Sequence, residues 1–265
     1  MNLSISLSLG STHSAGFNPA AALFGAGEQG CWLDPSDFST MFQDSAGTTP
    51  VTAVGQPVGR ILDKSGRGNH ATVAAAGSRP TLEQDASGRY FLLFDGIDDF
   101  LQTGTITPGI DKAQVFAGVR KLSDVGVGSL LAISADPTTN NGSLGILAPE
   151  TAAANTYHVS SRGTAMATAT GSGFAAPITS VLTGLGDISG DSTILRVNGT
   201  QAAINTADQG TGNFLTYPHF IGRLGGTSLP FNGRLYQLIT RFGANLSADR
   251  IAQTETFVNQ RTGAF

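Results

Sequence analysis

The carboxylates are the first residues to examine for chemistry, because glycoside hydrolysis needs two of them beside one bond. The 265-residue chain contains only four glutamates, at Glu28, Glu83, Glu150 and Glu255. A single Glu-x-Asp pattern occurs, at Glu83–Asp85, and Gly88 stands where a second glutamate would complete a set on one face of a strand. The other three glutamates are far apart in the sequence. We therefore interpret the glutamates as exposed loop acids and predict no glycosidase.

A serine nucleophile or a histidine base has no better support. A nucleophile elbow reads Gly-x-Ser-x-Gly, and the nearest segment, Asn141–Gly145, has the wrong spacing and the composition of a turn. We interpret His70 as a hydrogen-bonded structural residue rather than a base. No His-x-x-x-His pair is formed by the four histidines, His13, His70, His158 and His219. We expect a non-enzymatic protein without catalytic residues.

The densest cluster of carboxylates is Asp95, Asp98 and Asp99, which makes these three the candidate metal ligands. Calcium takes about six to eight oxygen ligands, and one turn with three acids supplies about half of them. The alternative is turn chemistry, in which Asp95-Gly96 makes the bend and the other two acids accept backbone N–H groups. Cys31 is the single cysteine, which excludes multi-cysteine zinc motifs. We expect no metal and no cofactor.

Three aromatic residues are candidates for stacking on a sugar ring, namely Trp32, Tyr157 and Tyr217. Trp32 is the single tryptophan of the chain. The alternative for each residue is that it anchors the hydrophobic core, since large aromatic rings bury much apolar area. The sequence leaves both interpretations open.

Composition excludes several classes of protein. The formal net charge is −4, so no basic surface is available for a nucleic acid backbone. No run of 18 apolar residues is present, so we expect no membrane insertion. The N-terminus has neither a basic segment nor a continuous apolar one, and it is a poor signal peptide. Few Glu and Lys, together with 35 Gly and 11 Pro, favour strands and turns over helices.

Short apolar stretches separated by turn signals predict an all-β protein. Asn198-Gly199 marks the clearest hairpin, because this dipeptide supplies the positive φ angles of a tight turn. The expected strands are 89–94, 113–119, 129–134, 144–147, 156–160, 178–183, 193–197, 219–221 and 233–240. One helix is expected near the C-terminus, with Ser247 as its N-cap and Gly263 beyond its last turn. Many strands without intervening helices predict an antiparallel sandwich.

Residues 1–30 are expected to form an N-terminal docking arm, and residues 31–265 the sandwich. Leu3, Ile5, Leu7 and Leu9 alternate with serines, which predicts a strand with one apolar face. The twenty residues that follow are rich in Gly, Ala and Ser. Such a strand needs a sheet edge to pair with, on a neighbouring chain or, as the alternative, on its own sandwich.

Several motifs in a fixed order resemble the concanavalin A-like lectin/glucanase superfamily in its laminin G-like form. The motifs are Asp63–Ala71, Phe94–Leu101, Leu195–Gly199, Ile221–Arg223 and Phe231–Tyr236. This resemblance implies a two-sheet antiparallel jelly-roll sandwich with a short C-terminal helix. Glycanases of the superfamily carry a Glu-x-Asp-x-x-Glu strand, and this chain departs from that pattern at Gly88.

The segment Gly27–Gly59 is similar to the opening of phage and prophage structural proteins. This similarity implies a non-enzymatic bacteriophage virion protein, either a tail-associated adhesin or a capsid decoration protein, that is made in the host cytoplasm. Its expected partners are other virion proteins, further copies of itself with a trimer favoured, and host surface polysaccharide. The alternative is a stand-alone bacterial carbohydrate-binding lectin or an inactive glycanase-like protein.

Overall fold

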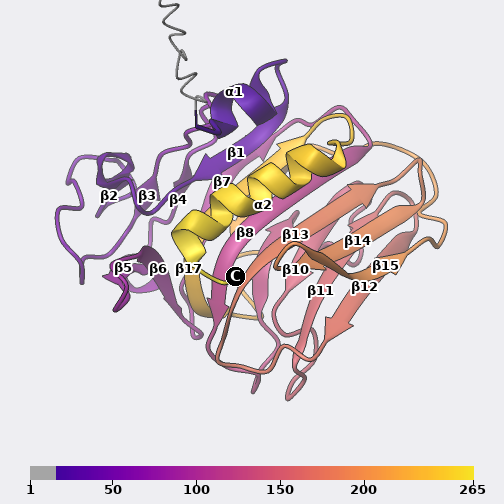
Figure 1. The fold of residues 1–265 in the computed structure, drawn as a ribbon. Helices are drawn as coiled ribbons and strands as arrows, with labels where there is room; N and C mark the ends of the chain where they lie inside the picture. The colour runs from indigo at the N-terminus through magenta and orange to yellow at the C-terminus, as the bar shows by residue number, and fades with distance from the viewer. Residues whose placement is uncertain (1–15) are drawn as a thin grey trace, which may run out of the picture.

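Two antiparallel sheets packed face to face make up the protein, and the computed structural model describes residues 16–265 (Figure 1). The two-sheet β-sandwich with one C-terminal helix that the sequence predicts is thereby confirmed. The first sheet runs in the order β15-β14-β13-β8-β17-β6-β5, and β1 adds to β17. Its strands are β1 (Gln29–Leu33), β5 (Thr81–Gln84), β6 (Tyr90–Asp95), β8 (Lys112–Lys121), β13 (Ile178–Asp187), β14 (Ser192–Val197), β15 (Thr200–Asn205) and β17 (Asn232–Phe242).

The second sheet has nine strands in the order β12-β11-β10-β9-β16-β7-β4-β3-β2. Apolar side chains from the facing sides of both sheets form the main core. The strands are β2 (Met41–Phe42), β3 (Arg60–Ile61), β4 (Ala71–Thr72), β7 (Leu101–Ile106), β9 (Ser129–Ile133), β10 (Ser143–Leu147), β11 (Thr156–Arg162), β12 (Met166–Ser172) and β16 (Tyr217–Ile221).

Helix α2 (Ala248–Thr262) lies across the outer side of the first sheet (Figure 1). Ser247 caps its N-terminus by accepting a hydrogen bond from the Arg250 N–H, and Gly263 ends it with a φ of 65°. The helix comes so close to β8 that a Cβ on Gly118 would collide with Thr262. A second, smaller core forms beneath it, made of Leu23, Phe24, Trp32, Phe116, Val181, Ile239 and Val258.

The expected boundary between arm and sandwich at residue 30 does not coincide with a change of structure. Helix α1 (Pro19–Phe24) buries Leu23 and Phe24 in the second core, and β1 already begins at Gln29. Leu23 also accepts a hydrogen bond from the buried Arg241. Residues 17–30 therefore pack on the sandwich instead of forming a free linker. The apolar positions Leu3, Ile5, Leu7 and Leu9 lie outside the described residues.

Strand β17 is the strand that joins the halves of the first sheet. Its first half pairs with β6 and its second half with β1, while β8 pairs along its whole length on the other side. A bulge at Tyr236 separates the two halves. Within residues 16–265 no helix is long and apolar enough to cross a membrane.

Candidate functional site

A pocket of about 360 Å³ opens on the outer side of the second sheet, over strands β9 to β12. Loops 134–142 and 222–231 border it, contributing Pro137, Thr138, Leu224 and Leu229. This volume lies in the range of small-ligand sites. The remaining lining residues come from the strands and the turns beside them: Ser129, Leu131, Ala132, Gly145, Leu147, Glu150, His158, Ser160, Met166 and Thr168.

Strand alternation explains why polar side chains reach this pocket. On β11, Tyr157 and Val159 enter the core, so His158 and Ser160 point to the opposite side. The register then aligns neighbours across the strands, because His158 is opposite Thr170 and Ser160 is opposite Thr168. One polar row therefore runs across β11 and β12.

His158, Glu150 and Thr170 form a closed hydrogen-bond triangle. The His158 Nδ1 lies 3.0 Å from Glu150 Oε1 and 2.9 Å from Thr170 Oγ1. The Thr170 hydroxyl donates to Glu150 Oε2 over 3.0 Å. Because the Thr170 proton is directed at Glu150, Nδ1 must be the donor to both oxygens, and the neutral ring carries its proton there. Nε2 is then an unprotonated acceptor.

The electrostatics keep this histidine neutral. Burial lowers the pKa of His158, and the nearby Glu150 carboxylate offsets part of that shift. Only 6% of the residue is exposed. Within the described part of the chain Nε2 makes no hydrogen bond, yet it is not enclosed, so it faces the pocket as a bare lone pair. A neutral ring with a fixed tautomer is suited to accept a hydroxyl proton from a ligand.

The rest of the pocket combines small floor residues with apolar walls. A Cβ on Gly145 would come within 3.0 Å of the Ser160 Oγ and 3.4 Å of Pro137, so a larger residue would fill the floor. Leu147, Leu224 and Leu229 supply apolar surface. This arrangement can hold a small ligand that has hydroxyl groups on one side and C–H groups on another.

Two of the three residues predicted to stack on sugars are buried. Trp32 is 8% exposed and packs edge-on against Phe257, with the Lys64 ammonium 4.8 Å above its ring. Tyr157 is fully buried and its hydroxyl donates to Ser180. Neither ring offers a free face to a sugar, because Trp32 packs in the second core beneath α2 and Tyr157 in the main core between the sheets. Trp32 and Tyr157 are therefore placed as anchors of the hydrophobic core, which was the alternative to sugar stacking.

Tyr217 is the third predicted stacking residue, and it is half-buried. It packs against the main core, and its hydroxyl donates to the Asn141 carbonyl over 3.1 Å. That bond ties β16 to the loop before β10. Tyr217 does not line the pocket at His158.

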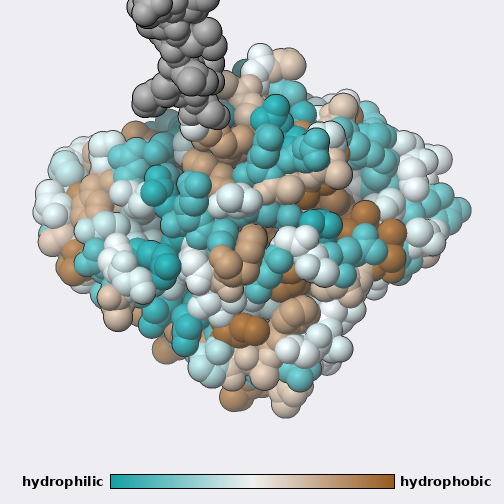
Figure 2. All heavy atoms as spheres, in the orientation of Figure 1, coloured by the Kyte–Doolittle hydropathy of each residue, from teal (hydrophilic) through white to brown (hydrophobic). Residues whose placement is uncertain are grey.

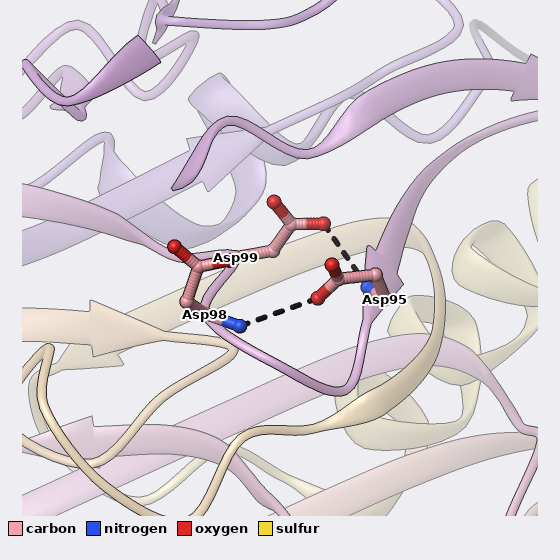
Figure 3. Close-up of side chains that lie close together, drawn as sticks. All are labelled: Asp95, Asp98 and Asp99. Carbon is pink, nitrogen blue, oxygen red and sulfur yellow. Dashed lines mark hydrogen bonds between the residues drawn. The ribbon is translucent and has the colours of Figure 1, made fainter. Parts of the chain in front are cut away.

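Asp95, at the end of β6, comes together with Asp98 and Asp99 of the turn that follows (Figure 3), with ligand atoms within 4.8 Å of one another. Asp95 Oδ1 accepts the N–H groups of Ile97 and Asp98, and Asp99 Oδ2 accepts the Asp95 N–H over 3.0 Å. Burial raises the pKa of Asp99 to about 6, and the neighbouring carboxylates add to that shift. These bonds are the turn chemistry that the sequence offered as the alternative to metal binding.

The four glutamates occupy four separate places, and the interpretation of all four as exposed loop acids is wrong, since Glu255 is buried on α2. Glu28 pairs with Arg241 at 2.8 Å, Glu255 with Arg196 at 2.7 Å, and Glu150 with His158, while Glu83 lies on the short strand β5. Sequence reasoning treated Glu150 and His158 as unrelated. A usable signal was the alternation of polar His158 and Ser160 with apolar Tyr157 and Val159, but the approach of Glu150 depends on the fold of the segment between them.

Comparisons with known proteins give a likeness of fold. No protein-family model matches the chain, and no curated protein sequence matches it. Among solved structures, the receptor-binding domain of botulinum neurotoxin mosaic serotype C/D matches 87% of this chain with a TM-score of 0.58 and 8% identity. The serotype D ligand-binding domain in complex with N-acetylneuraminic acid matches 91% with a TM-score of 0.55 and 10% identity.

A third structure is the binding domain of botulinum neurotoxin DC in complex with SialylT, which matches 75% of this chain with a TM-score of 0.53 and 10% identity. Our chain spans about half the length of these three chains, between 48% and 53%. At such low identity the likeness shows the fold alone. That fold is a β-sandwich of two antiparallel sheets.

Proposed function

We propose that the protein is a non-catalytic carbohydrate-binding module whose ligand occupies the pocket at His158. The observation that carries this proposal is the hydrogen-bond triangle, which fixes His158 Nε2 as an acceptor beside the Glu150 carboxylate and apolar walls. The fold likeness supports it further, because two of the similar chains are described in complex with SialylT or N-acetylneuraminic acid.

A sugar ring matches this pocket in two ways. Its hydroxyl groups donate to His158 Nε2 and Glu150, with the Ser160 and Thr168 hydroxyls as further partners at the floor. Its C–H face packs on Leu147, Leu224 or Leu229. Hydrogen bonds contribute about 0.5–1.5 kcal/mol each between neutral groups and about 1.5–3 kcal/mol to a charged group such as the Glu150 carboxylate, so we expect weak binding to one sugar and tighter binding to a longer glycan.

The same residues argue against hydrolysis as the function. Both glycosidase mechanisms need a second carboxylate across the scissile bond. Glu150 is the single carboxylate among the described residues that line the pocket. Its oxygens are already engaged by His158 and Thr170. We therefore assign Glu150 to binding.

Glycan arrays followed by calorimetry on the best ligand test this proposal. His158→Phe removes the acceptor and Glu150→Gln removes the carboxylate, and we expect each variant to weaken binding about tenfold. Glu83→Gln is the matched control, since it removes a carboxylate on the other sheet and is expected to bind like the wild type. Unchanged affinity in both pocket variants would show that glycans bind elsewhere, and no binding by the wild type would refute the proposal.

The setting in which the module works is proposed from the sequence resemblance. We place it on a bacteriophage particle, as a tail-associated or capsid-decorating protein that contacts host surface glycans. The test is mass spectrometry of purified particles, and absence from every particle would refute this setting. A glycan-binding monomer found outside any particle would favour the stand-alone lectin instead.

A further inference from the structure

Two arginines face each other on the outer side of the first sheet, away from the pocket at His158. Arg120 of β8 and Arg234 of β17 are direct register partners, and both are half-buried. Like charges directly opposite one another destabilise a strand pair. Within residues 16–265 neither guanidinium makes an ion pair with a carboxylate. The pair therefore lacks a counter-charge.

A depression of about 480 Å³ opens over these arginines, between the β5–β6 turn and the C-terminal end of α2. Asp85 is the single carboxylate among the described residues that line it. Its oxygens accept the Ser87 and Arg89 N–H groups and the Tyr236 hydroxyl. The Arg89 side chain lies 3.8 Å from Asp85 and also packs on Gly263, where the negative end of the helix dipole favours a cation.

The charges therefore separate into two groups. Asp85 and Arg89 neutralise each other at the rim. Arg120 and Arg234 remain, with two positive charges that face the same depression. Figure 2 shows the side of the molecule that carries α2, where hydrophilic and apolar side chains are interspersed. The arginine pair is thus a local concentration of charge on a protein whose formal net charge is −4.

Neighbouring side chains hold both guanidinium groups in place. Arg120 Nη1 donates to the Thr179 Oγ1 over 2.9 Å, which leaves the Thr179 hydroxyl proton available for a ligand. Arg234 lies 4.5 Å above the centre of the Phe91 ring, and its Nε is buried without an acceptor in the described part of the chain. Two guanidinium groups held in place, with a hydroxyl beside them, are the set of hydrogen-bond donors that oxyanions prefer.

We propose that this depression binds a tetrahedral oxyanion, a phosphate or sulfate group, between Arg120 and Arg234. Each guanidinium group can donate two hydrogen bonds to such an oxyanion, and the Thr179 hydroxyl can donate one more. A doubly charged group balances the charge of the arginine pair. The group is either a free anion or the substituent of a sugar, and the site does not depend on the pocket at His158.

Thermal unfolding of the full chain tests the site, with inorganic phosphate, sulfate, acetate or chloride at one ionic strength. Phosphate and sulfate are expected to raise the melting temperature by several degrees above chloride, and acetate by less. Arg120→Gln/Arg234→Gln is expected to abolish the shift, and each single variant to weaken phosphate binding about tenfold in calorimetry. Arg60→Gln/Arg79→Gln removes the same charge elsewhere and should retain the shift.

A second measurement needs no ligand. Because Arg120→Gln removes a repulsion between two positive charges, this variant should have a higher melting temperature than Arg60→Gln in chloride buffer.

Galactose 6-sulfate distinguishes a free anion from a group carried by a sugar. If it binds about tenfold more tightly than sulfate, the natural ligand carries the group on a sugar, and equal binding indicates a free anion. Equal melting temperatures in phosphate and chloride, or a shift that survives in the double variant, would overturn the proposal. Glu150→Gln should leave the phosphate shift intact.

Discussion

His219 lies between the two sheets with its Nδ1 3.3 Å from the Thr240 hydroxyl oxygen. That oxygen also accepts the Cys31 N–H over 3.1 Å and lies 3.4 Å from the Cys31 Sγ, so the imidazole and β1 meet at one hydroxyl. The ring is fully buried, and burial lowers the pKa of His219 to about 3. A core histidine that stays neutral in the folded state makes stability depend on pH.

We expect acid to destabilise the protein through this residue. In the unfolded chain a histidine protonates near pH 6.5, whereas folded His219 does so near pH 3. The contribution of His219 to the free energy of unfolding is therefore fully present above pH 6.5 and is lost as the pH falls towards 3. Between pH 6.5 and 5 the loss is about 2 kcal/mol. His219→Leu should show a smaller loss over this interval in denaturant unfolding, and a parallel loss in both proteins would contradict the assignment.

Asp99 is expected to give stability the opposite pH dependence to His219, so that the protein loses stability as the pH rises. Its folded pKa of about 6 lies above the unfolded value of 3.8, so its contribution is present below pH 3.8 and is lost as the pH rises through 6. Asp99→Asn keeps an oxygen for the Asp95 N–H and removes the buried charge. We expect the variant to be more stable than the wild type by about 1–3 kcal/mol at pH 8, and not at pH 4.

Calcium tests whether the same three carboxylates bind a metal ion. If Asp95, Asp98 and Asp99 serve the turn alone, millimolar calcium chloride should raise the melting temperature no more than magnesium chloride at equal concentration. A calcium-specific rise that disappears in Asp99→Asn would instead show that the three carboxylates bind the ion.

The hairpin between β14 and β15 turns at two residues with positive φ, Asn198 at 51° and Gly199 at 78°. A β-branched residue resists this conformation, so Gly199→Val should lower the free energy of unfolding by about 1–3 kcal/mol. Gly104→Val is the control, because Gly104 is in β7 without a positive φ and with open space at its Cβ position. Equal melting temperatures for the two variants would mean that the turn conformation is not strained by valine.

Two truncations separate the parts of the N-terminal segment. Removing residues 2–15 should leave the melting temperature unchanged and, if Leu3, Ile5, Leu7 and Leu9 dock on another chain, should reduce the oligomer in light scattering. Removing residues 2–28 should cost about 3–5 kcal/mol of stability, because the buried Arg241 would lose Glu28. Stability retained after the longer truncation would show that α1 contributes nothing to the sandwich.

Large apolar residues made much of the sheet predictable. Nine expected strands overlap strands of the structure, and the caps of α2 stand at Ser247 and Gly263 as predicted. Strand β12 was missed because its inward residues are Ala167, Ala169 and Gly171, which give too weak an apolar alternation. The packing of helix α1 on the sandwich was missed for the same reason, since alanines precede its buried residues Leu23 and Phe24.

The candidate pocket could not be predicted, because its parts meet through register and loop placement. Thr170 reaches His158 only through the pairing of β11 with β12, and Glu150 reaches it from the segment before β11. The burial of two of the three aromatic candidates could not be predicted either. Trp32 and Tyr157 carry the area that a core needs, and sequence alone does not distinguish that use from ligand stacking.

The position of β17 in the chain also determines how the protein can fold during synthesis. Strands β1, β6 and β8 all pair with β17, yet about 200 residues separate it from β1. Until β17 leaves the ribosome, β1 has no partner and the centre of the first sheet is open. Such distant pairings slow folding and expose strand edges to aggregation. Overexpression should therefore yield more folded protein at low temperature or with chaperones that hold nascent chains.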